Sequence, residues 1–195
     1  VVQPDKSILA TGKNAAVELY ELVMPCDQPV HAIRLEALKH KSFVGGGTGR
    51  GSNGNFVLSE FQVAVSPDQK SDFQNVKIAT AEADYSQANY HISQAIDGNI
   101  DRTGWAVDGN TKFENRVAVF HLAERLQPDR TARIRVQLVH RWGGSHHIGR
   151  FRISLATRPV RSVPADVNAI VRIDEAGRTP EQSSRLTEFL IEQYG

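Results

Sequence analysis

Alternating apolar and polar positions dominate most of the chain. Residues 31–38, 133–139 and 150–155 each place an apolar side chain at every second position, with charged or polar side chains between them. A period of two is typical of a strand that buries one face. Apolar runs over residues 56–65 and 116–122 predict two further strands. The pattern therefore predicts an all-β body.

Two more segments add to the expected sheets. Residues 7–24 hold two apolar stretches separated by the turn signal at residues 12–14, which favours a hairpin, although the second stretch also fits a short helix. Residues 78–84 fit a short strand. Within residues 56–65, alternation places these apolar side chains on one face: Val57, Phe61, Val63 and Val65.

The strand pattern is absent from the last part of the chain. Residues 165–173 have a helix-like pattern, and Thr179 and Gln182 have the spacing of a capping box, with Pro180 at the first helical position. The apolar stripe that follows consists of Leu186, Phe189 and Leu190. We therefore expect a helical extension after the β body.

Length and composition fit one globular body with an appendage. The chain has 195 residues, of which 40% are hydrophobic, and a net charge of +1. We place the β body at residues 1–160 and the extension at residues 161–195. No apolar run approaches the roughly 18 residues of a membrane span, so we expect no membrane contact. The single cysteine, Cys26, excludes an internal disulfide and is interpreted as a small structural residue.

The glycine-rich segment over residues 45–55 is one candidate binding loop. It contains six glycines but no phosphate-binding lysine, which disfavours nucleotide binding. A loop with few side chains lets a ligand approach the backbone, and Arg50, Asn53 and Asn55 supply polar groups. The alternative is a plain surface loop.

The segment over residues 140–147 is the stronger binding candidate. Trp142 offers an aromatic face for sugar C–H groups, and Arg141, His140 and His146 offer hydrogen bonds to hydroxyls. His147 leads into a strand, which favours a structural role. No cysteine or well-placed acid completes a zinc site around these histidines. The alternative is a loop whose tryptophan packs inward.

A concentration of arginines is a further candidate. Residues 130–161 hold eight arginines and no acid. Alternation places Arg133, Arg135, Arg150 and Arg152 on outward faces, and on neighbouring strands they would form one surface for a sulfated or uronate polysaccharide. The favoured alternative is pairing with acids, Glu36 and Glu60 among them. Nucleic acid is disfavoured because base-stacking aromatics are scarce.

The segment over residues 93–107 concentrates oxygen donors at short spacing. Asp97, Asn99, Asp101 and Thr103 surround a turn centred on Gly98. Hard oxygens in a tight loop suit calcium. The alternative is a calcium-free turn over a core tryptophan, Trp105.

A family resemblance enters at this loop. Ala-Ile-Asp-Gly-Asn at residues 95–99, with Thr-Gly-Trp at 103–105, resembles the calcium loop of discoidin-type domains, the galactose-binding-like jelly rolls that include many carbohydrate-binding modules. Leu-Ser-Glu-Phe at residues 58–61 is similar to a late strand of that family, which implies that Glu60 also binds the calcium. Here the strand precedes the loop, so the body resembles a permuted or extended version of that jelly roll.

The combination of these stretches with residues 33–36 and 147–154 is similar to a module of large secreted planctomycete proteins that also carry cytochrome-c-like domains. The resemblance implies an extracellular or periplasmic protein in which this module contacts other domains of the same chain. The resemblance therefore implies a role in the binding or processing of polysaccharides.

These observations lead to one expectation and two alternatives. We expect a jelly-roll β-sandwich that binds a polysaccharide without catalysis. The expected glycan contacts are Trp142, Arg141, His140, His146, Arg50 and Asn53. The expected ligands of a structural calcium are Asp97, Asn99, Thr103 and Glu60. The alternatives are a structural spacer and a polysaccharide-active enzyme, which would need two acids facing each other in a cleft.

Overall fold

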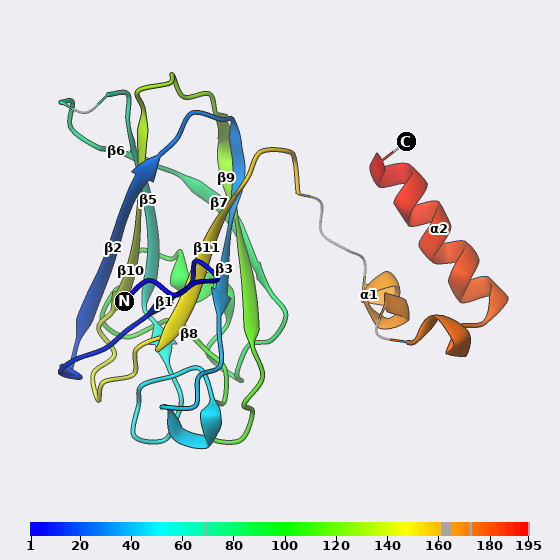
Figure 1. Cartoon of the computed structure of the whole chain (residues 1–195), viewed down its shortest axis with the longest axis horizontal. Coiled ribbons are helices and arrows are strands. Elements are labelled where there is room, and N and C mark those ends of the chain that lie inside the picture. Colours follow the sequence, from blue (N-terminus) through cyan, green and yellow to red (C-terminus); the bar gives the residue numbers. More distant parts are fainter. Residues whose placement is uncertain (69, 161–164, 172, 195) are drawn as a thin grey trace. The chain divides into compact units, whose positions relative to one another are not determined.

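The structure is a computed structural model that describes the whole chain except residues 69, 161–164, 172 and 195. The chain forms two compact units, Val1–Pro159 and Val160–Gly195. The first unit carries the strands and the second carries the helices (Figure 1). None of the described helices is long and apolar enough to span a membrane.

The first unit is an antiparallel β-sandwich, as the alternating pattern predicts. One sheet contains, in spatial order, β1 (Ile8–Leu9), β11 (Arg150–Ala156), β3 (Val30–Ala37), β9 (Arg116–Leu126) and β7 (Ile78–Ala83). The opposite sheet contains β2 (Glu18–Pro25), β10 (Arg133–His140), β5 (Glu60–Ser66) and β6 (Gln74–Val76). A short ribbon pairs β4 (Val57–Leu58) with β8 (Trp105–Ala106). Two 3-10 helices, Val44–Gly46 and Ile92–Ala95, lie in the connections.

The chain passes repeatedly from one sheet of the sandwich to the other. β2 and β10 belong to one sheet, whereas β3 and β11, which follow them in the chain, belong to the opposite sheet. Most strands therefore pair with strands far away in the sequence, whereas β5 and β6 are consecutive. The all-β sandwich expected from the sequence is the fold of this unit.

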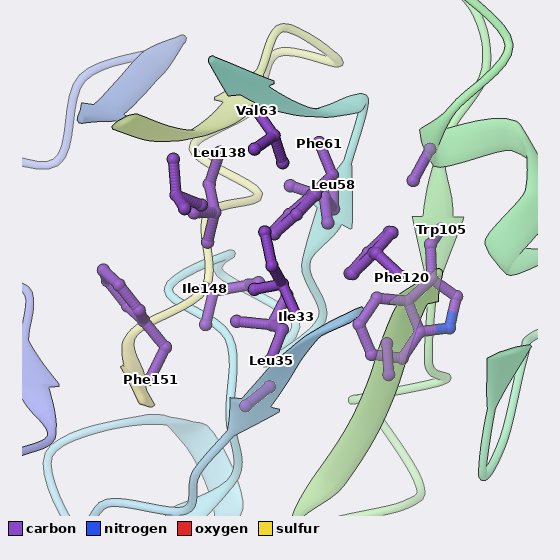
Figure 2. Close-up of a cluster of buried hydrophobic side chains, with 14 of the residues drawn as sticks. Ile33, Leu35, Leu58, Phe61, Val63, Trp105, Phe120, Leu138, Ile148 and Phe151 are labelled. Carbon is purple, nitrogen blue, oxygen red and sulfur yellow. The ribbon is translucent and has the colours of Figure 1, made fainter. Parts of the chain in front are cut away.

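The core fills the space between the two sheets. Ile33 and Leu35 of β3 face Phe61 of β5 and Leu138 of β10 (Figure 2). The rings of Phe61 and Phe120 stack with centroids 3.8 Å apart, and this contact joins the two sheets. The apolar positions of the alternating segments are the ones that point into the sandwich.

The hairpin expected over residues 7–24 is wrong. β1 pairs with β11 in one sheet, and β2 pairs with β10 in the other. Gly12, whose φ of 79° favours glycine, turns the chain from the first sheet to the second instead of folding it back on itself. The Gly12 turn does change the direction of the chain, but its local sequence does not specify the strand with which each segment pairs.

The segment over residues 56–65 is divided into two strands. Ser59 interrupts it because its backbone N–H donates to the Val139 carbonyl, 2.8 Å away, and its hydroxyl accepts from the Arg141 N–H at 3.0 Å. Both Val57 and Leu58 are buried, which alternation alone does not allow. Beyond the break, alternation resumes in β5.

The single arginine surface considered from the sequence is also wrong. Arg133 and Arg135 lie on β10 and Arg150 and Arg152 lie on β11, and these strands belong to opposite sheets. The guanidiniums of Arg133 and Arg135 lie over the ring of Phe73, 5.2 and 4.7 Å from its centroid. A period of two fixes which side chains point outward, but it does not fix the sheet to which a strand belongs.

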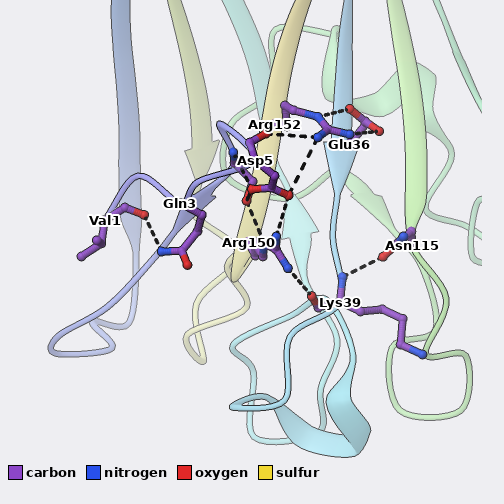
Figure 3. A network of polar contacts seen from close by, with 9 residues as sticks. Val1, Gln3, Asp5, Glu36, Lys39, Asn115, Arg150 and Arg152 are labelled. Atoms are coloured by element: carbon purple, nitrogen blue, oxygen red, sulfur yellow. Dashed lines mark hydrogen bonds and ion pairs between the residues drawn. The ribbon is translucent and has the colours of Figure 1, made fainter.

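Acids pair with the arginines of β11, as the alternative interpretation predicted. Arg152 forms a two-pronged contact with Glu36 of β3, with nitrogen–oxygen distances of 2.7 and 3.0 Å (Figure 3). Arg150 donates to Asp5 at 2.7 Å. The Arg152 guanidinium holds the pKa of the Glu36 carboxyl below its usual range.

The second unit consists of α1 (Ala165–Val171), a 3-10 turn (Glu175–Gly177) and α2 (Pro180–Tyr194). The expected capping box is confirmed, since the Thr179 hydroxyl accepts from the Gln182 N–H at 3.3 Å and the Gln182 side chain accepts from the Thr179 N–H at 2.9 Å. Phe189 is buried, whereas Leu190 is exposed. Residues 161–164 and 172, at the start of the expected extension and inside its first helical segment, lie outside the described residues.

Candidate functional site

Loops from three parts of the sequence meet at one end of the sandwich. The Arg50 N–H donates to the His147 carbonyl at 2.8 Å, and its guanidinium donates to the Gly12 carbonyl at 2.8 Å. The Asn14 amide donates to the Arg50 carbonyl at 2.9 Å, and the Ser145 hydroxyl donates to the Ala15 carbonyl at 2.7 Å. The two loops that the sequence singles out for binding are therefore neighbours.

Trp142 lies at the surface of this end, with 39% of its area exposed. Its ring meets the ring of Tyr90 nearly edge to face, with centroids 5.2 Å apart and an interplanar angle of 80°. The contact fixes the orientation of the indole and leaves part of it open to solvent. Tyr90 has no distinguishing signal in the sequence, since it lies in a polar segment without a periodic pattern.

Arg141 directly precedes Trp142 in the chain, and its side chain is held by an acid of another loop. Its Nε donates to an Asp101 carboxylate oxygen at 3.1 Å, and both side chains are largely exposed. The pair ties the Trp142 loop to the oxygen-rich loop over residues 97–103. Because Asp101 neutralises it, Arg141 presents hydrogen-bond donors rather than a free positive charge.

His140 does not reach the surface, contrary to its expected contact with a glycan. Only 1% of the residue is exposed, and its Nδ1 lies 2.8 Å from the Val57 carbonyl, to which it donates. Burial lowers the pKa of the ring to about 3. His140 is the last residue of β10 and continues the buried series of Ile134, Val136 and Leu138. The period of two therefore predicts that His140 points inward.

His146, Arg50 and Asn53 lie around the glycine-rich loop. His146 is half-buried, and a Cβ atom added to Gly51 would stand 3.0 Å from its ring, so the backbone there packs closely against the histidine. Arg50 and Gly51 line a groove of about 390 Å³ next to Gly12 and Asn14. Asn53 is exposed, and its side-chain oxygen accepts from the Asn55 N–H at 3.0 Å.

Asn55, which the sequence offered as a ligand group, is a buried structural residue. Its side-chain oxygen accepts from the Gly109 N–H at 2.9 Å, and its amide nitrogen donates to Gln87 at 2.8 Å. Asn55 therefore connects the glycine-rich loop to the segment that follows β8. A glycan would not reach it without disrupting these bonds.

The loop over residues 97–103 folds its oxygens toward one another. One Asp97 carboxylate oxygen accepts from the Asn99 N–H at 2.8 Å and from the Thr103 hydroxyl at 3.1 Å. The same hydroxyl lies 2.9 Å from the Asn99 carbonyl, to which it also donates. Trp105 packs into the core below, where its Nε1 donates to the Tyr85 carbonyl at 2.9 Å.

Glu60 reaches this loop from the adjacent sheet. Phe61 and Val63 point into the core, so Glu60 points to the outer face of β5, where the Gly98 N–H donates to it at 3.3 Å. The residue is 6% exposed. Burial, with a further effect from the nearby Asp97 carboxylate, raises the pKa of Glu60 to about 7.

Asp97, Asn99 and Thr103 contact one another, and Glu60 contacts the same loop at Gly98 and lines one groove with Asp97. A buried carboxylate next to a second carboxylate is stabilised by a proton or by a cation. The described residues contain no group of three or more His, Cys, Asp or Glu side chains that could hold a metal ion. Glu60 and Asp97 would therefore supply the charge, and the Asn99 and Thr103 oxygens would supply neutral ligands.

No protein-family model, no curated protein sequence and no solved structure matches the chain. The most informative features are the exposed Trp142 and the buried Glu60.

Proposed function

We propose that the chain is a non-catalytic carbohydrate-binding module whose platform is Trp142. The observation that carries the proposal is the partial exposure of an indole that is held in place by Tyr90. Sugars stack their C–H faces on aromatic rings, and a ring fixed before binding loses little conformational entropy. Arg141, the residue before Trp142, and its partner Asp101 would offer donors and acceptors to hydroxyl groups.

The ligand that best fits this site is a neutral polysaccharide. Arg141 is neutralised by Asp101, and the arginines of β10 and β11 lie on opposite sheets. A sulfated or uronate chain would need several guanidiniums on one surface. Arg50, Asn53 and His146 belong to the neighbouring loop and would contact the glycan beyond the platform.

A structural calcium ion forms part of the proposal. Glu60, Asp97, Asn99 and Thr103 would hold it, and it would fix the loop that positions Asp101 next to Arg141. The resemblance of this loop to that of discoidin-like domains supports the assignment. So does the similarity to a module of large secreted planctomycete proteins, in which neighbouring domains of the same extracellular or periplasmic chain are the partners.

The test is binding to neutral, uronate and sulfated polysaccharides at low and high salt concentration. We expect binding to a neutral polysaccharide that changes little with salt. Trp142→Ala should weaken this binding at least about tenfold, since stacking on an aromatic ring supplies most of the contact area. Val23→Ala, which trims another exposed apolar side chain, is the control and should bind normally.

Two results would contradict the proposal. Binding by Trp142→Ala with unchanged affinity would move the site elsewhere. A folded, calcium-loaded wild-type protein that binds none of the polysaccharides would favour the structural spacer.

A second candidate function, hydrolysis of a glycosidic bond, is favoured by one observation. Glu60 and Asp97 both line a groove of about 400 Å³, and the raised pKa of Glu60 suits a general acid. Release of reducing ends from a polysaccharide, lost in Glu60→Gln, would support this function. Calcium bound by both carboxylates would exclude it, because neither group could then transfer a proton.

A further inference from the structure

A groove of about 390 Å³ lies on the outer face of the four-stranded sheet. Its floor is formed by Leu19 of β2 and Val139 of β10, which are direct neighbours in the strand register. Ile100, from the loop over residues 97–103, forms part of its lining, and so does Arg141. The groove is therefore built from the sheet, from the loop over residues 97–103 and from Arg141 at the start of the Trp142 loop.

Polar side chains cross the sheet in one row beside this apolar floor. Gln137 of β10 is in register with Gln62 of β5 and with Glu21 of β2. The Gln137 amide donates to Glu21 at 2.8 Å, which leaves the Gln62 amide, an exposed group, to point at a ligand. An apolar strip flanked by amide groups matches a sugar ring, which has C–H groups on its faces and hydroxyls at its edge.

The charges around the groove select against an anionic chain. Glu18 lines the groove, and Glu21 lies beside it, in register with Gln137. The positive charge of Arg141 is neutralised by Asp101. Among the described residues that line the groove, the one cation, Arg141, is thus already paired, so a uronate or sulfate group would face the Glu18 carboxylate, whereas a neutral sugar would carry no charge to repel.

The groove is continuous in sequence with the Trp142 platform. Arg141 lines the groove and directly precedes Trp142, and its partner Asp101 directly follows Ile100. The backbone positions of the platform and of the groove are thus one residue apart, and a ligand on Trp142 would have to extend past Arg141 to enter the groove.

We propose that this groove is a second subsite for further sugar units of the chain that stacks on Trp142. The module would then bind the interior of a long, unbranched neutral polysaccharide rather than its end. The inference rests on the proposed function, because it needs a glycan on the platform.

The experiment compares Leu19→Lys with Val23→Lys in calorimetric titrations with a disaccharide and a hexasaccharide of the neutral polysaccharide that the protein binds. Both residues lie on the outer face of β2, and their exposed fractions are similar, 49% for Leu19 and 47% for Val23. Of these two residues, Leu19 lines the groove and Val23 does not. The wild-type protein and Val23→Lys should bind the hexasaccharide at least about tenfold more tightly than the disaccharide. Leu19→Lys should lose that gain and keep the affinity for the disaccharide, whereas Trp142→Ala should weaken both.

Two outcomes overturn the groove while the proposed function stands: an affinity that does not rise with chain length, and a hexasaccharide affinity that is unchanged in Leu19→Lys. Failure of the wild-type protein to bind any glycan would instead overturn the proposed function. A lower melting temperature of Leu19→Lys than of Val23→Lys would show that Leu19→Lys disturbs the fold. In that case Gln62→Ala, which removes the exposed amide, is used in place of Leu19→Lys. Gln62→Ala should reduce the gain in affinity from the disaccharide to the hexasaccharide.

Discussion

His140 and Glu60 are ionisable side chains that the fold buries at neighbouring ends of β10 and β5. Burial disfavours the charged form of each, so it lowers the pKa of the histidine and raises that of the glutamate. The two residues therefore remain neutral over a range in which exposed residues of their type would be charged. Each one makes a property of the protein depend on pH.

The first dependence concerns stability in acid. In the unfolded chain His140 binds a proton near pH 6.5, whereas in the folded chain its pKa is about 3. Between these values the unfolded state binds more protons, so the free energy of unfolding should fall as the pH falls, by up to about 1.4 kcal/mol per pH unit. Urea denaturation between pH 7.5 and 4.5 should show a weaker dependence in His140→Asn, which keeps a donor toward Val57. Equal slopes for the two proteins would contradict the buried, neutral histidine.

The second dependence concerns calcium. Without a cation, Glu60 holds its proton up to about pH 7, so the proposed calcium ion would have to displace that proton. Calcium affinity should therefore rise as the pH increases from 6 to 8, and binding at pH 6 should release protons. Calorimetry in buffers of different ionisation enthalpy measures both effects.

Chelation gives the companion test of that site. Removal of calcium with EDTA should lower the melting temperature of the wild-type protein, and Glu60→Gln should abolish this response because the amide carries no charge. An unchanged melting temperature in EDTA, together with equal calcium affinity at both pH values, would leave the loop as a calcium-free turn.

At the scale of the elements, an ion pair joins two neighbouring strands of the five-stranded sheet. β3 lies between β11 and β9, and its Glu36 faces Arg152 in the strand register. The side chain of Glu36 is buried, so its charge needs the guanidinium more than an exposed carboxylate would. Glu36 also contacts Arg34 at 3.1 Å, but the Arg34 side chain is more exposed to solvent than that of Arg152.

This difference gives a prediction with a matched pair of variants. Arg152→Met should destabilise the fold by about 2 kcal/mol, because it removes the two-pronged partner of a buried carboxylate. Arg34→Met should cost less than about 1 kcal/mol, as is usual for an exposed ion pair. Urea denaturation at pH 7 measures both values. Equal losses would show that the strand register, rather than burial, determines the strength of the pair.

At the scale of the whole molecule, the sandwich has a core of its own. The buried apolar cluster is drawn from both sheets of the first unit and from the connections between them (Figure 2). The wrapping of the chain brings the loops around Gly12, Arg50 and Trp142 to one end, where the proposed glycan site lies.

A truncated chain tests this independence. Residues 1–159 alone should fold cooperatively and bind the same polysaccharide with the affinity of the full chain, since their core and loops are intact. Circular dichroism melts and calorimetry measure the two properties. A truncated chain that melts well below the full chain would assign the helices a role in the stability of the sandwich.

The sequence by itself determined the local structure. The period of two identified the strands. It also places His140 on the buried side of β10, which disagrees with the expected glycan contact of this residue. The spacing of Thr179 and Gln182 identified the start of α2. Each of these features depends on neighbours a few residues apart, so the information lies within one segment.

Only the tertiary structure decided which segments meet. It assigned β1 and β2 to different sheets, separated the arginines of β10 from those of β11, and placed Tyr90 against Trp142. It also covered Glu60 with the loop that contains Gly98. The physical reason is that alternation specifies an inward and an outward face, whereas the partner of each face depends on packing among strands that are distant in the sequence.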